Sequence, residues 1–345
     1  MLPSVISHIE HRSLNLSLNR PKKLNVLNDN IISELKNALD KAQEDSSIDR
    51  VFITGEGDKG FCAGGDVVNV IQSFKEGKYS DPGHFFKEEY AVDLKIHEFT
   101  KPIIALCHGI IMGGGLGLVN GATVRVFSPD ALVSMPEITI GFFPDVGASF
   151  FLNQLERKWS LFLALTGARL DASMAHHFKL CDFIIDKEDW NEIKRSSGHE
   201  ELLSLCKMKD LSSSMRNFDE SEFRDLDIID SMLTIEEFDH WAKNYIQTPN
   251  AHPWIVNSLK TYLSGSPYSA KIIWNYFLWA RNKTLKECFA MDYRIGSFIL
   301  QNGDFSEGVR ALLMDKDKSP QWKFKSVEEI KVEDWEELRS WFSSL

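Results

Sequence analysis

Two carboxylates lie eight residues apart in an otherwise apolar segment of the chain. Glu137 and Asp145 belong to the run MPEITIGFFPDVG, in which most other side chains are apolar. Apolar surroundings raise the pKa of a carboxyl group and reduce its hydration, which suits a general base or a carboxylate nucleophile. A pair of capping or salt-bridged acids near a turn would have the same spacing. The two acids are therefore candidates for catalysis, and their spacing alone does not decide their role.

Two glycine-rich segments could bind the oxygen of a substrate carbonyl. FCAGGD begins at Phe61 and HGIIMGGGLG begins at His108, and each follows a short strand-like run. Glycine lets a ligand approach the backbone closely, and N–H groups are exposed near the start of a helix. Two converging N–H groups can form an oxyanion hole, in which the loss of one donor typically costs about 10²–10³ in rate. Glycines also permit tight strand-to-helix turns, so either segment by itself could be purely structural.

A third glycine run, GEGDKG at residues 55–60, formally matches the dinucleotide-binding pattern GxGxxG. That pattern requires a helix to open within it. Here FCAGGD follows, and a helical pattern begins only at VVNVIQSF. We therefore interpret these glycines as turn residues and expect no nicotinamide cofactor. The histidines in HIEH and AHHF lack the spacing of zinc ligands, so no metal is expected either.

Short strands and intervening helices must position these segments. NLSLN alternates as a strand does, and RVFIT, PIIALC and TVRVFS are short apolar or β-branched runs. Such strands between helices indicate a sheet that is buried on both faces. Asn28 or Asp29 can cap a helix whose apolar positions recur at helical spacing from Ile31 to Ala42. The sequence therefore predicts an α/β core over residues 1–186.

The character of the chain changes after Asp186. Residues 187–237 are polar and contain no strand-like run, and the sequence looks helical and amphipathic from Trp254 onward. One stripe of this later part is apolar, which is typical of core packing, and it comprises Ile272, Ile273, Tyr276, Phe277 and Ala280. We therefore predict a mainly helical C-terminal region over residues 187–345.

The composition restricts the classes of partner. In a chain of 345 residues, 43% hydrophobic and 26% charged residues are ordinary for a globular protein, and no run approaches the ~20 apolar residues of a membrane span. A net charge of −11 argues against nucleic acid as a partner. Five scattered cysteines suit a reducing compartment. The N-terminal residues lack the features of a secretory signal or a transit peptide, so we expect a cytoplasmic protein or, if a leader has been removed, a mitochondrial matrix protein.

Taken in order, NRPKKLNVLN, KGFCAGGDV, KPIIALCHGIIMGGGLGL and MPEITIGFFPDVG resemble the enoyl-CoA hydratase/isomerase (crotonase) superfamily. FFKEEY and the late run DFSEGVRALLMDKDKSPQW resemble its branch that hydrolyses 3-hydroxyisobutyryl-CoA, and the similarity covers nearly the whole chain. The resemblance implies a crotonase-like spiral of repeated ββα units. It also implies hydrolysis of a short-chain 3-hydroxyacyl-CoA, with 3-hydroxyisobutyryl-CoA from valine breakdown as the family's substrate. Coenzyme A is then part of the substrate, and no separate cofactor is expected.

The resemblance also implies roles for individual residues. The oxyanion hole would be formed by the N–H groups of Ala63 and Gly114. Glu137 would act as nucleophile or as general base, and Asp145 would orient water or pass a proton to the leaving thiolate. Glu89 would contact the substrate together with Gly114 and the two acids. The residues expected to face the coenzyme A moiety are Lys23, Leu24, Val26, Ala63, Gly65 and Asp66.

The sequence departs from the family pattern at a few positions. Gly117 stands where hydratases carry one of two catalytic glutamates, so two-glutamate hydration is not expected. Asp93 replaces a usual asparagine and Ala148-Ser149 replaces a glycine pair, which leaves the preferred acyl group open. An isomerase or hydratase of the same fold and a non-catalytic scaffold are the alternatives. Family members commonly form trimers or hexamers, so a homo-oligomer is possible, although the C-terminal helices could cover the same surface.

Overall fold

A computed structural model describes residues 3–215 and 218–343 of the chain, which form two compact units. The first, called here the α/β unit, contains the chain through Asp66 and the segments Glu88–Ser134 and Arg169–Phe218. The second, called here the helical unit, contains Val67–Lys87, Met135–Ala168 and the chain from Asp219 onward. All the strands formed by the described residues belong to the α/β unit.

The larger sheet of the α/β unit has six strands in the order β1-β2-β3-β5-β7-β10. β1 pairs with β2 in antiparallel fashion, and each of the other neighbouring pairs is parallel. The strands are β1 (Val5–Glu10), β2 (Ser13–Leu18), β3 (Arg50–Gly55), β5 (Ile103–Cys107), β7 (Val124–Phe127) and β10 (Phe183–Ile184). The predicted strand segments NLSLN, RVFIT, PIIALC and TVRVFS are thereby confirmed as β2, β3, β5 and β7.

A smaller sheet has four strands in the order β4-β6-β8-β9, of which β4, β6 and β8 are the second strands of their repeats. Its strands are β4 (Gly60–Cys62), β6 (Ile110–Met112), β8 (Leu132–Ser134) and β9 (Leu170–Asp171). The chain passes from β3 to β4, from β5 to β6 and from β7 to β8, so each repeat places one strand in each sheet before a helix follows. This arrangement is the predicted spiral of ββα units.

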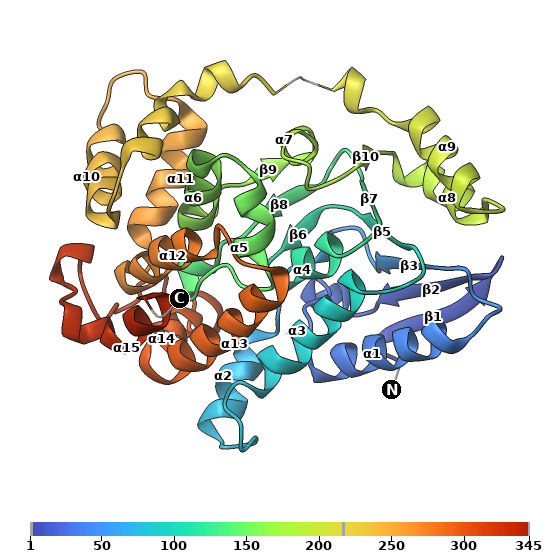
Figure 1. Cartoon of the computed structure of the whole chain (residues 1–345), viewed down its shortest axis with the longest axis horizontal. Coiled ribbons are helices and arrows are strands. Elements are labelled where there is room, and N and C mark those ends of the chain that lie inside the picture. Colours follow the sequence, from blue (N-terminus) through green and yellow to red (C-terminus); the bar gives the residue numbers. More distant parts are fainter. Residues whose placement is uncertain (1–2, 216–217, 344–345) are drawn as a thin grey trace. The chain divides into compact units, whose positions relative to one another are not determined.

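Helices cover the larger sheet. α1 packs on β1 and β2 (Figure 1). Of the two residues that the sequence offered as its cap, Asn28 or Asp29, the structure shows Asn28, whose side chain accepts a hydrogen bond of 3.0 Å from Ile31 N. The helices of this unit are η1 (Pro21–Lys23), α1 (Asp29–Glu44), α3 (His84–His97, in this unit from Glu88 on), α4 (Gly114–Asn120), α7 (Ala172–His177), η4 (Lys187–Asp189), α8 (Trp190–Arg195), α9 (His199–Lys209) and η5 (Ser212–Ser214).

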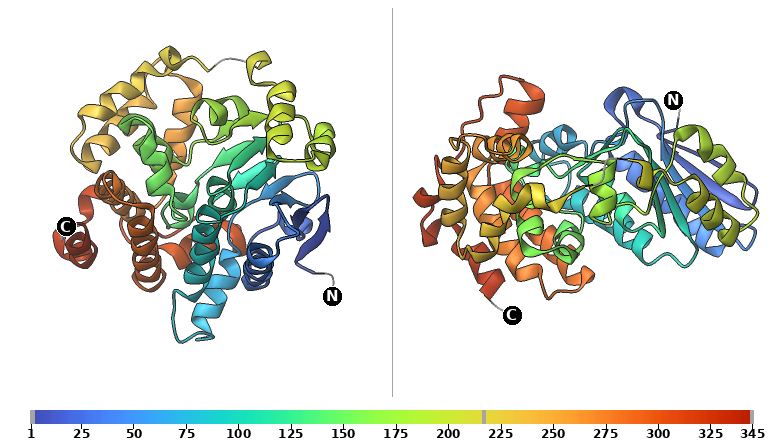
Figure 2. Two further views of the ribbon diagram at one scale, coloured as in Figure 1. Left: turned by 45° about the vertical axis from the view of Figure 1, so that its right-hand side comes forward. Right: turned by 90° about the horizontal axis from the view of Figure 1, so that it is seen from above.

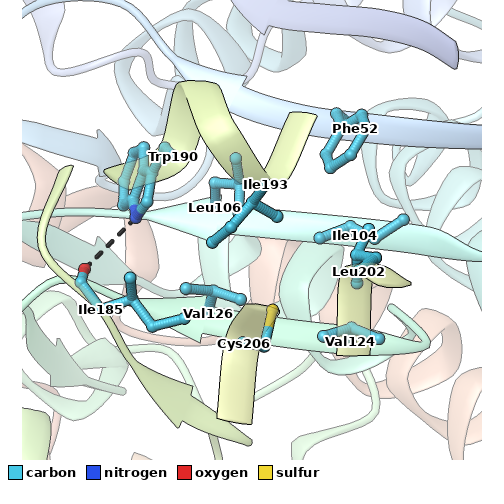
Figure 3. Close-up of a cluster of buried hydrophobic side chains, with 10 residues drawn as sticks. All are labelled: Phe52, Ile104, Leu106, Val124, Val126, Ile185, Trp190, Ile193, Leu202 and Cys206. Carbon is cyan, nitrogen blue, oxygen red and sulfur yellow. Dashed lines mark hydrogen bonds between the residues drawn. The ribbon is translucent and has the colours of Figure 1, made fainter. Parts of the chain in front are cut away.

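A cluster of buried apolar side chains joins α8 and α9 to the larger sheet (Figure 3). The strands contribute aromatic and branched side chains such as Phe52 and Leu106, and the helices contribute Trp190, Ile193 and Leu202. The indole N–H of Trp190 donates a hydrogen bond to the Ile185 carbonyl at 3.3 Å. Burying each large apolar side chain contributes about 1.5–3 kcal/mol, so this cluster holds the polar segment after residue 186 onto the strands.

The helical unit contains α2 (Val67–Lys75), η2 (Glu137–Ile140), α5 (Ala148–Phe151), η3 (Leu152–Gln154), α6 (Arg157–Thr166), η6 (Glu220–Ser231), α10 (Ile235–Tyr245), α11 (Pro253–Ser264), α12 (Pro267–Ala280), α13 (Leu285–Asn302), α14 (Phe305–Val309), η7 (Arg310–Met314), η8 (Val327–Glu329) and α15 (Val332–Ser343). α6 packs against η6, α11 and α12 (Figure 2). The predicted apolar stripe of α12 is buried, so its assignment to core packing is confirmed.

The expected change to helices after residue 186 is confirmed, because β10 ends at Ile184 and the described residues beyond it form no further strand. The compact units are nevertheless interleaved along the sequence, and the division into domains at residue 186 stays a prediction. Within residues 3–215 and 218–343, no helix is both long enough and apolar enough to cross a membrane.

Candidate active site

The predicted coenzyme-facing residues lie on two segments of the α/β unit that are hydrogen bonded to each other. Ala63 N donates to Leu24 O at 3.0 Å, and Leu27 N donates to Gly64 O at 2.8 Å. Asp66 N then donates to Leu27 O at 2.7 Å, which completes the pairing of the two segments. The structure therefore brings together all six residues that were predicted to face coenzyme A, namely Lys23, Leu24, Val26, Ala63, Gly65 and Asp66.

An ion pair fastens the same two segments at one end. Arg20 Nη2 lies 2.8 Å from Asp66 Oδ2, and Arg20 Nη1 donates to Val26 O at 2.7 Å. Lys23 Nζ lies 3.9 Å from the same Asp66 oxygen, but its side chain is 65% exposed. Asp66 thus has a structural partner in Arg20, whose role the sequence analysis missed, whereas the Lys23 ammonium is accessible to an anionic ligand.

The structure argues against the N–H group of Ala63 as an oxyanion donor, because that group already donates to Leu24 O. Among residues 3–215 and 218–343, the N–H groups of Gly65 and Gly114 have no hydrogen-bond acceptor. The loops that carry them adjoin, since a Cβ atom on Gly64 would lie 3.6 Å from Gly114 N. Gly64 has φ +99°, a conformation that glycine adopts without steric cost. This conformation turns the backbone just before Gly65. The amides of Gly65 and Gly114 are therefore free to bind a ligand, whereas the amide of Ala63, which we expected to be a donor, is not.

A buried carboxylate lies beside this pair of loops. A Cβ atom on Gly114 would lie 2.1 Å from Glu89 Oε1, so glycine at this position makes room for the Glu89 side chain. Glu89 is 3% exposed, and Asp93, one turn later on α3, is fully buried. Burial, followed by the charges of these two acids, raises the pKa of the neighbouring Cys62 thiol to about 12. The structure therefore places the predicted substrate contact Glu89 next to Gly114.

The glycine run at residues 55–60 is a turn, as predicted, because β3 ends at Gly55 and β4 begins at Gly60. Gly57 has φ +85°, and its carbonyl oxygen lies 2.7 Å from His108 Nε2. His108 therefore anchors this turn, and burial lowers the pKa of its imidazole. No group of three or more metal-binding side chains is assembled by the part of the chain that the structure describes.

Glu137 lies at the start of η2 in the helical unit and is 7% exposed. Its backbone carbonyl accepts a hydrogen bond of 3.0 Å from Phe142 N, and Gly141 closes the turn with φ +69°. Its Oε2 atom accepts no hydrogen bond from the described residues. Burial first, and the charge of Asp145 second, raise the pKa of the Glu137 carboxyl well above its ordinary value. The predicted effect of the apolar neighbours is therefore present.

Asp145 lies in the same unit and is 6% exposed. Its carbonyl oxygen accepts a hydrogen bond of 2.8 Å from Ala148 N, which closes a turn in which Val146 and Gly147 have φ +50° and +77°. Its charge is the second cause, after burial, of the raised pKa of Glu137. Both acids of the predicted pair are therefore buried in the helical unit.

The late sequence run that begins DFSEGVR supports the turn of Glu137. A Cβ atom on Gly308 would lie 2.3 Å from the carbonyl carbon of Ile140, and one on Gly141 would lie 2.6 Å from that of Asp304. Asp304 accepts hydrogen bonds from the Ser266 hydroxyl at 2.6 Å and from Lys323 N at 2.9 Å. α14 therefore packs backbone to backbone against η2, a role for this run that its spacing did not reveal.

The α/β unit therefore has two adjoining loops with free amides, and the helical unit has a buried, weakly hydrated carboxyl. Residues 14–338 match the model of the enoyl-CoA hydratase/isomerase family. The chain belongs to this family. Among curated members of this enoyl-CoA hydratase/isomerase family, the human 3-hydroxyisobutyryl-CoA hydrolase, mitochondrial, is 36% identical over 342 residues, which cover 96% of this chain and 86% of that protein. The Arabidopsis thaliana 3-hydroxyisobutyryl-CoA hydrolase 1 is 32% identical over 328 residues, which cover 92% and 86%.

Solved structures of family members have the same fold. An enoyl-CoA hydratase from Rhodobacter sphaeroides 2.4.1 matches with a TM-score of 0.83 and 27% identity, covering 97% of this chain and 96% of that one. A carnitinyl-CoA dehydratase from Mycobacterium thermoresistibile matches with a TM-score of 0.85 and 26% identity over the same shares. The expected crotonase fold is therefore confirmed for this family member.

Proposed function

We propose that this chain hydrolyses short-chain 3-hydroxyacyl-CoA thioesters, with 3-hydroxyisobutyryl-CoA as the preferred substrate, to the 3-hydroxy acid and coenzyme A. The observation that carries this proposal is a buried carboxyl with a raised pKa, Glu137, flanked by Asp145 in a chain with glycine at position 117. The curated hydrolases that match along most of the chain support it. The reaction would belong to valine breakdown.

In the proposed reaction, the N–H groups of Gly65 and Gly114 stabilise the negative charge that forms on the thioester oxygen. Glu137 either attacks the carbonyl carbon to give a mixed anhydride, which water then cleaves, or removes a proton from the attacking water. In both routes the C–S bond breaks, one water is consumed and the thiolate of coenzyme A takes up a proton. Asp145 orients the water or delivers that proton.

The remaining predicted residues would bind the two ends of the substrate. We assign Glu89, which lies beside Gly114, to the acyl end. The exposed ammonium of Lys23 would pair with a phosphate of coenzyme A, and the paired segments around Leu24 and Asp66 would present their backbone to the rest of the moiety. No other cofactor is needed for this chemistry.

A hydratase or isomerase of the same fold is the alternative reaction. Hydration in this family uses two acids, but α4 begins Gly-Gly-Leu-Gly and has no carboxylate at position 117. An isomerase could use Glu137 and Asp145 for two-base proton transfer, so the acid pair alone does not separate it from a hydrolase. A non-catalytic scaffold would have no use for a buried carboxyl that is costly to hold.

Release of free thiol from purified protein tests the proposal. Incubation with 3-hydroxyisobutyryl-CoA and several other short 3-hydroxyacyl-CoA esters should release coenzyme A, with 3-hydroxyisobutyryl-CoA giving the highest kcat/KM. Crotonyl-CoA, tested in parallel, should be neither hydrated nor isomerised. If no short acyl-CoA releases thiol while crotonyl-CoA is converted, the alternative reaction is correct. If none of these thioesters reacts, the scaffold is correct.

The compartment and the assembly follow from the same assignment. The human and rat relatives are mitochondrial enzymes, which favours the mitochondrial matrix over the cytoplasm for this chain. We expect an acyl-CoA as the partner molecule and neither nucleic acid nor membrane. Whether the chain forms a homo-oligomer is decided by its mass in solution.

A further inference from the structure

Asp292 is a fully buried acid in the helical unit that the proposed reaction does not use. It lies on α13. One of its carboxylate oxygens accepts a hydrogen bond of 2.8 Å from Gly147 N, and the other accepts one of 2.6 Å from the Tyr276 hydroxyl. Burial first, and the charge of Asp145 second, raise the pKa of this carboxyl well above its ordinary value. Burying a carboxyl group costs free energy, and the hydrogen bonds that Asp292 accepts must offset this cost.

The turn that Asp292 binds is the one that carries Asp145. Val146, a β-branched residue, has φ +50°, a conformation that such side chains adopt only where their surroundings enforce it. Gly147 follows with φ +77°, and its N–H group points to the Asp292 carboxylate. Apolar side chains of α13 pack on the same glycine, since a Cβ atom on Gly147 would lie 3.2 Å from the ring of Phe289. α13 therefore fixes both the polar and the apolar side of this turn.

A second hydrogen bond ties the turn to the partner of Asp292. The Ser149 hydroxyl, at the start of α5, donates to the Tyr276 oxygen at 2.8 Å. The Tyr276 hydroxyl also lies 3.0 Å from Cys288 O, which gives its proton another acceptor if Asp292 is changed. The side chains of Ser149, Tyr276 and Asp292 are fully buried. The chain from Gly147 to Ser149 is thus attached at two points to one network.

We propose that Asp292 is a positioning residue for Asp145, because its carboxylate fastens the left-handed turn Val146–Gly147 that sets the direction of the Asp145 side chain. The proposal rests on the proposed function, in which Asp145 orients water or transfers a proton to the leaving thiolate. Asp292 would act through this turn rather than on the substrate, because its carboxylate is occupied by Gly147 N and the Tyr276 hydroxyl. Its removal should therefore slow the chemical step without weakening substrate binding.

Three substitutions separate this role from a purely structural one. Asp292→Ala and Asp292→Leu remove both acceptors, and the leucine keeps the branched shape of the aspartate in case the alanine variant does not fold. Asp292→Asn keeps one acceptor for Gly147 N, while its amide can donate to Tyr276, whose proton then moves to Cys288 O. Asp210→Ala is the matched control, because Asp210 accepts a backbone hydrogen bond of 2.9 Å from Ile184 N in the α/β unit.

We expect kcat for thioester hydrolysis to fall about 10- to 100-fold in the alanine or leucine variant with KM changed less than about threefold, and to return to within about threefold of wild type in the asparagine variant. The control should lose thermal stability and keep its kcat. Hydrogen exchange at the Gly147 amide should accelerate in the first two variants only. A folded alanine or leucine variant with wild-type kcat, or an asparagine variant as slow as these, overturns the proposal.

The exchange measurement separates this proposal from the proposed function. If the wild-type protein releases no coenzyme A, the hydrolase assignment fails. Slow exchange at Gly147 that depends on Asp292 would still support the fastening of the turn. Exchange at Gly147 that is equally fast in the wild-type and leucine variants would refute that fastening whatever the reaction is.

Discussion

Glu137 combines a reactive group with surroundings that disfavour its charge. Burial and the neighbouring Asp145 both raise its pKa, so its ionised form destabilises the folded state. The sign follows from the direction of the shift. Below the pKa of the unfolded chain the group is neutral in both states, and the destabilisation develops as the pH rises above that value. A carboxyl group that is buried beside another acid lowers the stability of the fold, so we expect Glu137 to contribute to function.

The first prediction concerns the substitution Glu137→Gln. It removes the carboxylate and should lower kcat about 10³-fold or more, while raising the Tm at neutral pH by roughly 2 °C. Steady-state thiol release and calorimetry measure the two effects. Glu336→Gln makes the same chemical change on the exposed face of α15 and should alter neither quantity. A glutamine variant at position 137 with near-normal turnover would move the chemistry to another residue.

The second prediction concerns the electrostatic coupling of the two acids. Asp145→Asn removes the second cause of the raised Glu137 pKa, so that pKa should fall. Because the reaction needs Glu137 ionised, the acid limb of the pH profile of kcat/KM should shift to lower pH, even though the variant is slower overall. A limb that stays in place or moves to higher pH would show that Asp145 does not influence the ionisation that limits the rate.

At the scale of elements, a glycine sets how closely a helix approaches the turn that carries Glu137. η2, which carries Glu137, packs against α14 with so little space that a single carbon atom on Gly308 would meet the Ile140 backbone. Backbone atoms cannot rotate aside as a side chain can. A displacement of α14 would therefore move the turn that carries Glu137. The position of Glu137 therefore depends on a segment 171 residues later in the chain.

The third prediction follows from this contact. Gly308→Ala should lower the free energy of unfolding by about 1–3 kcal/mol and reduce kcat about tenfold, because the added carbon displaces η2. Gly198→Ala is the control, since a Cβ atom there meets nothing within 4 Å. Denaturant unfolding and thiol release measure both variants. Equal behaviour of the two variants would contradict the importance of the close packing.

Local sequence signals predicted most of the fold and part of the site. Alternation and β-branched runs identified the strands, and one of the two proposed cap residues, Asn28, caps α1. The apolar neighbours of Glu137 correctly indicated a raised pKa. The donor pair could not be derived in this way. Whether the amide of Ala63 or of Gly65 is available depends on the hydrogen bond to Leu24 and on the positive φ of Gly64, which spacing does not encode.

At the scale of the whole molecule, the cysteines agree with the expectation of a reducing compartment. All five, Cys62, Cys107, Cys181, Cys206 and Cys288, are free and buried. Burial raises their thiol pKa values, so neither access nor ionisation favours reaction.

The fourth prediction is that the native protein resists thiol reagents. A disulfide-exchange dye at neutral pH should label less than one thiol per native chain, and all five cysteines should react once guanidinium has unfolded it. Rapid labelling of a native cysteine would show that its part of the core opens under native conditions.

The interleaving of the two compact units has a consequence for synthesis. The α/β unit ends at Phe218, so a growing chain can supply all of its segments while the last third is still unmade. The helical unit cannot be completed then, because Glu137 and Asp145 emerge early, whereas α13 and α14, which fasten their turns, emerge near the end. Almost the whole chain must therefore be synthesised before the turn of either acid can be fixed. We expect the nascent enzyme to be inactive until its final helices have been made and packed.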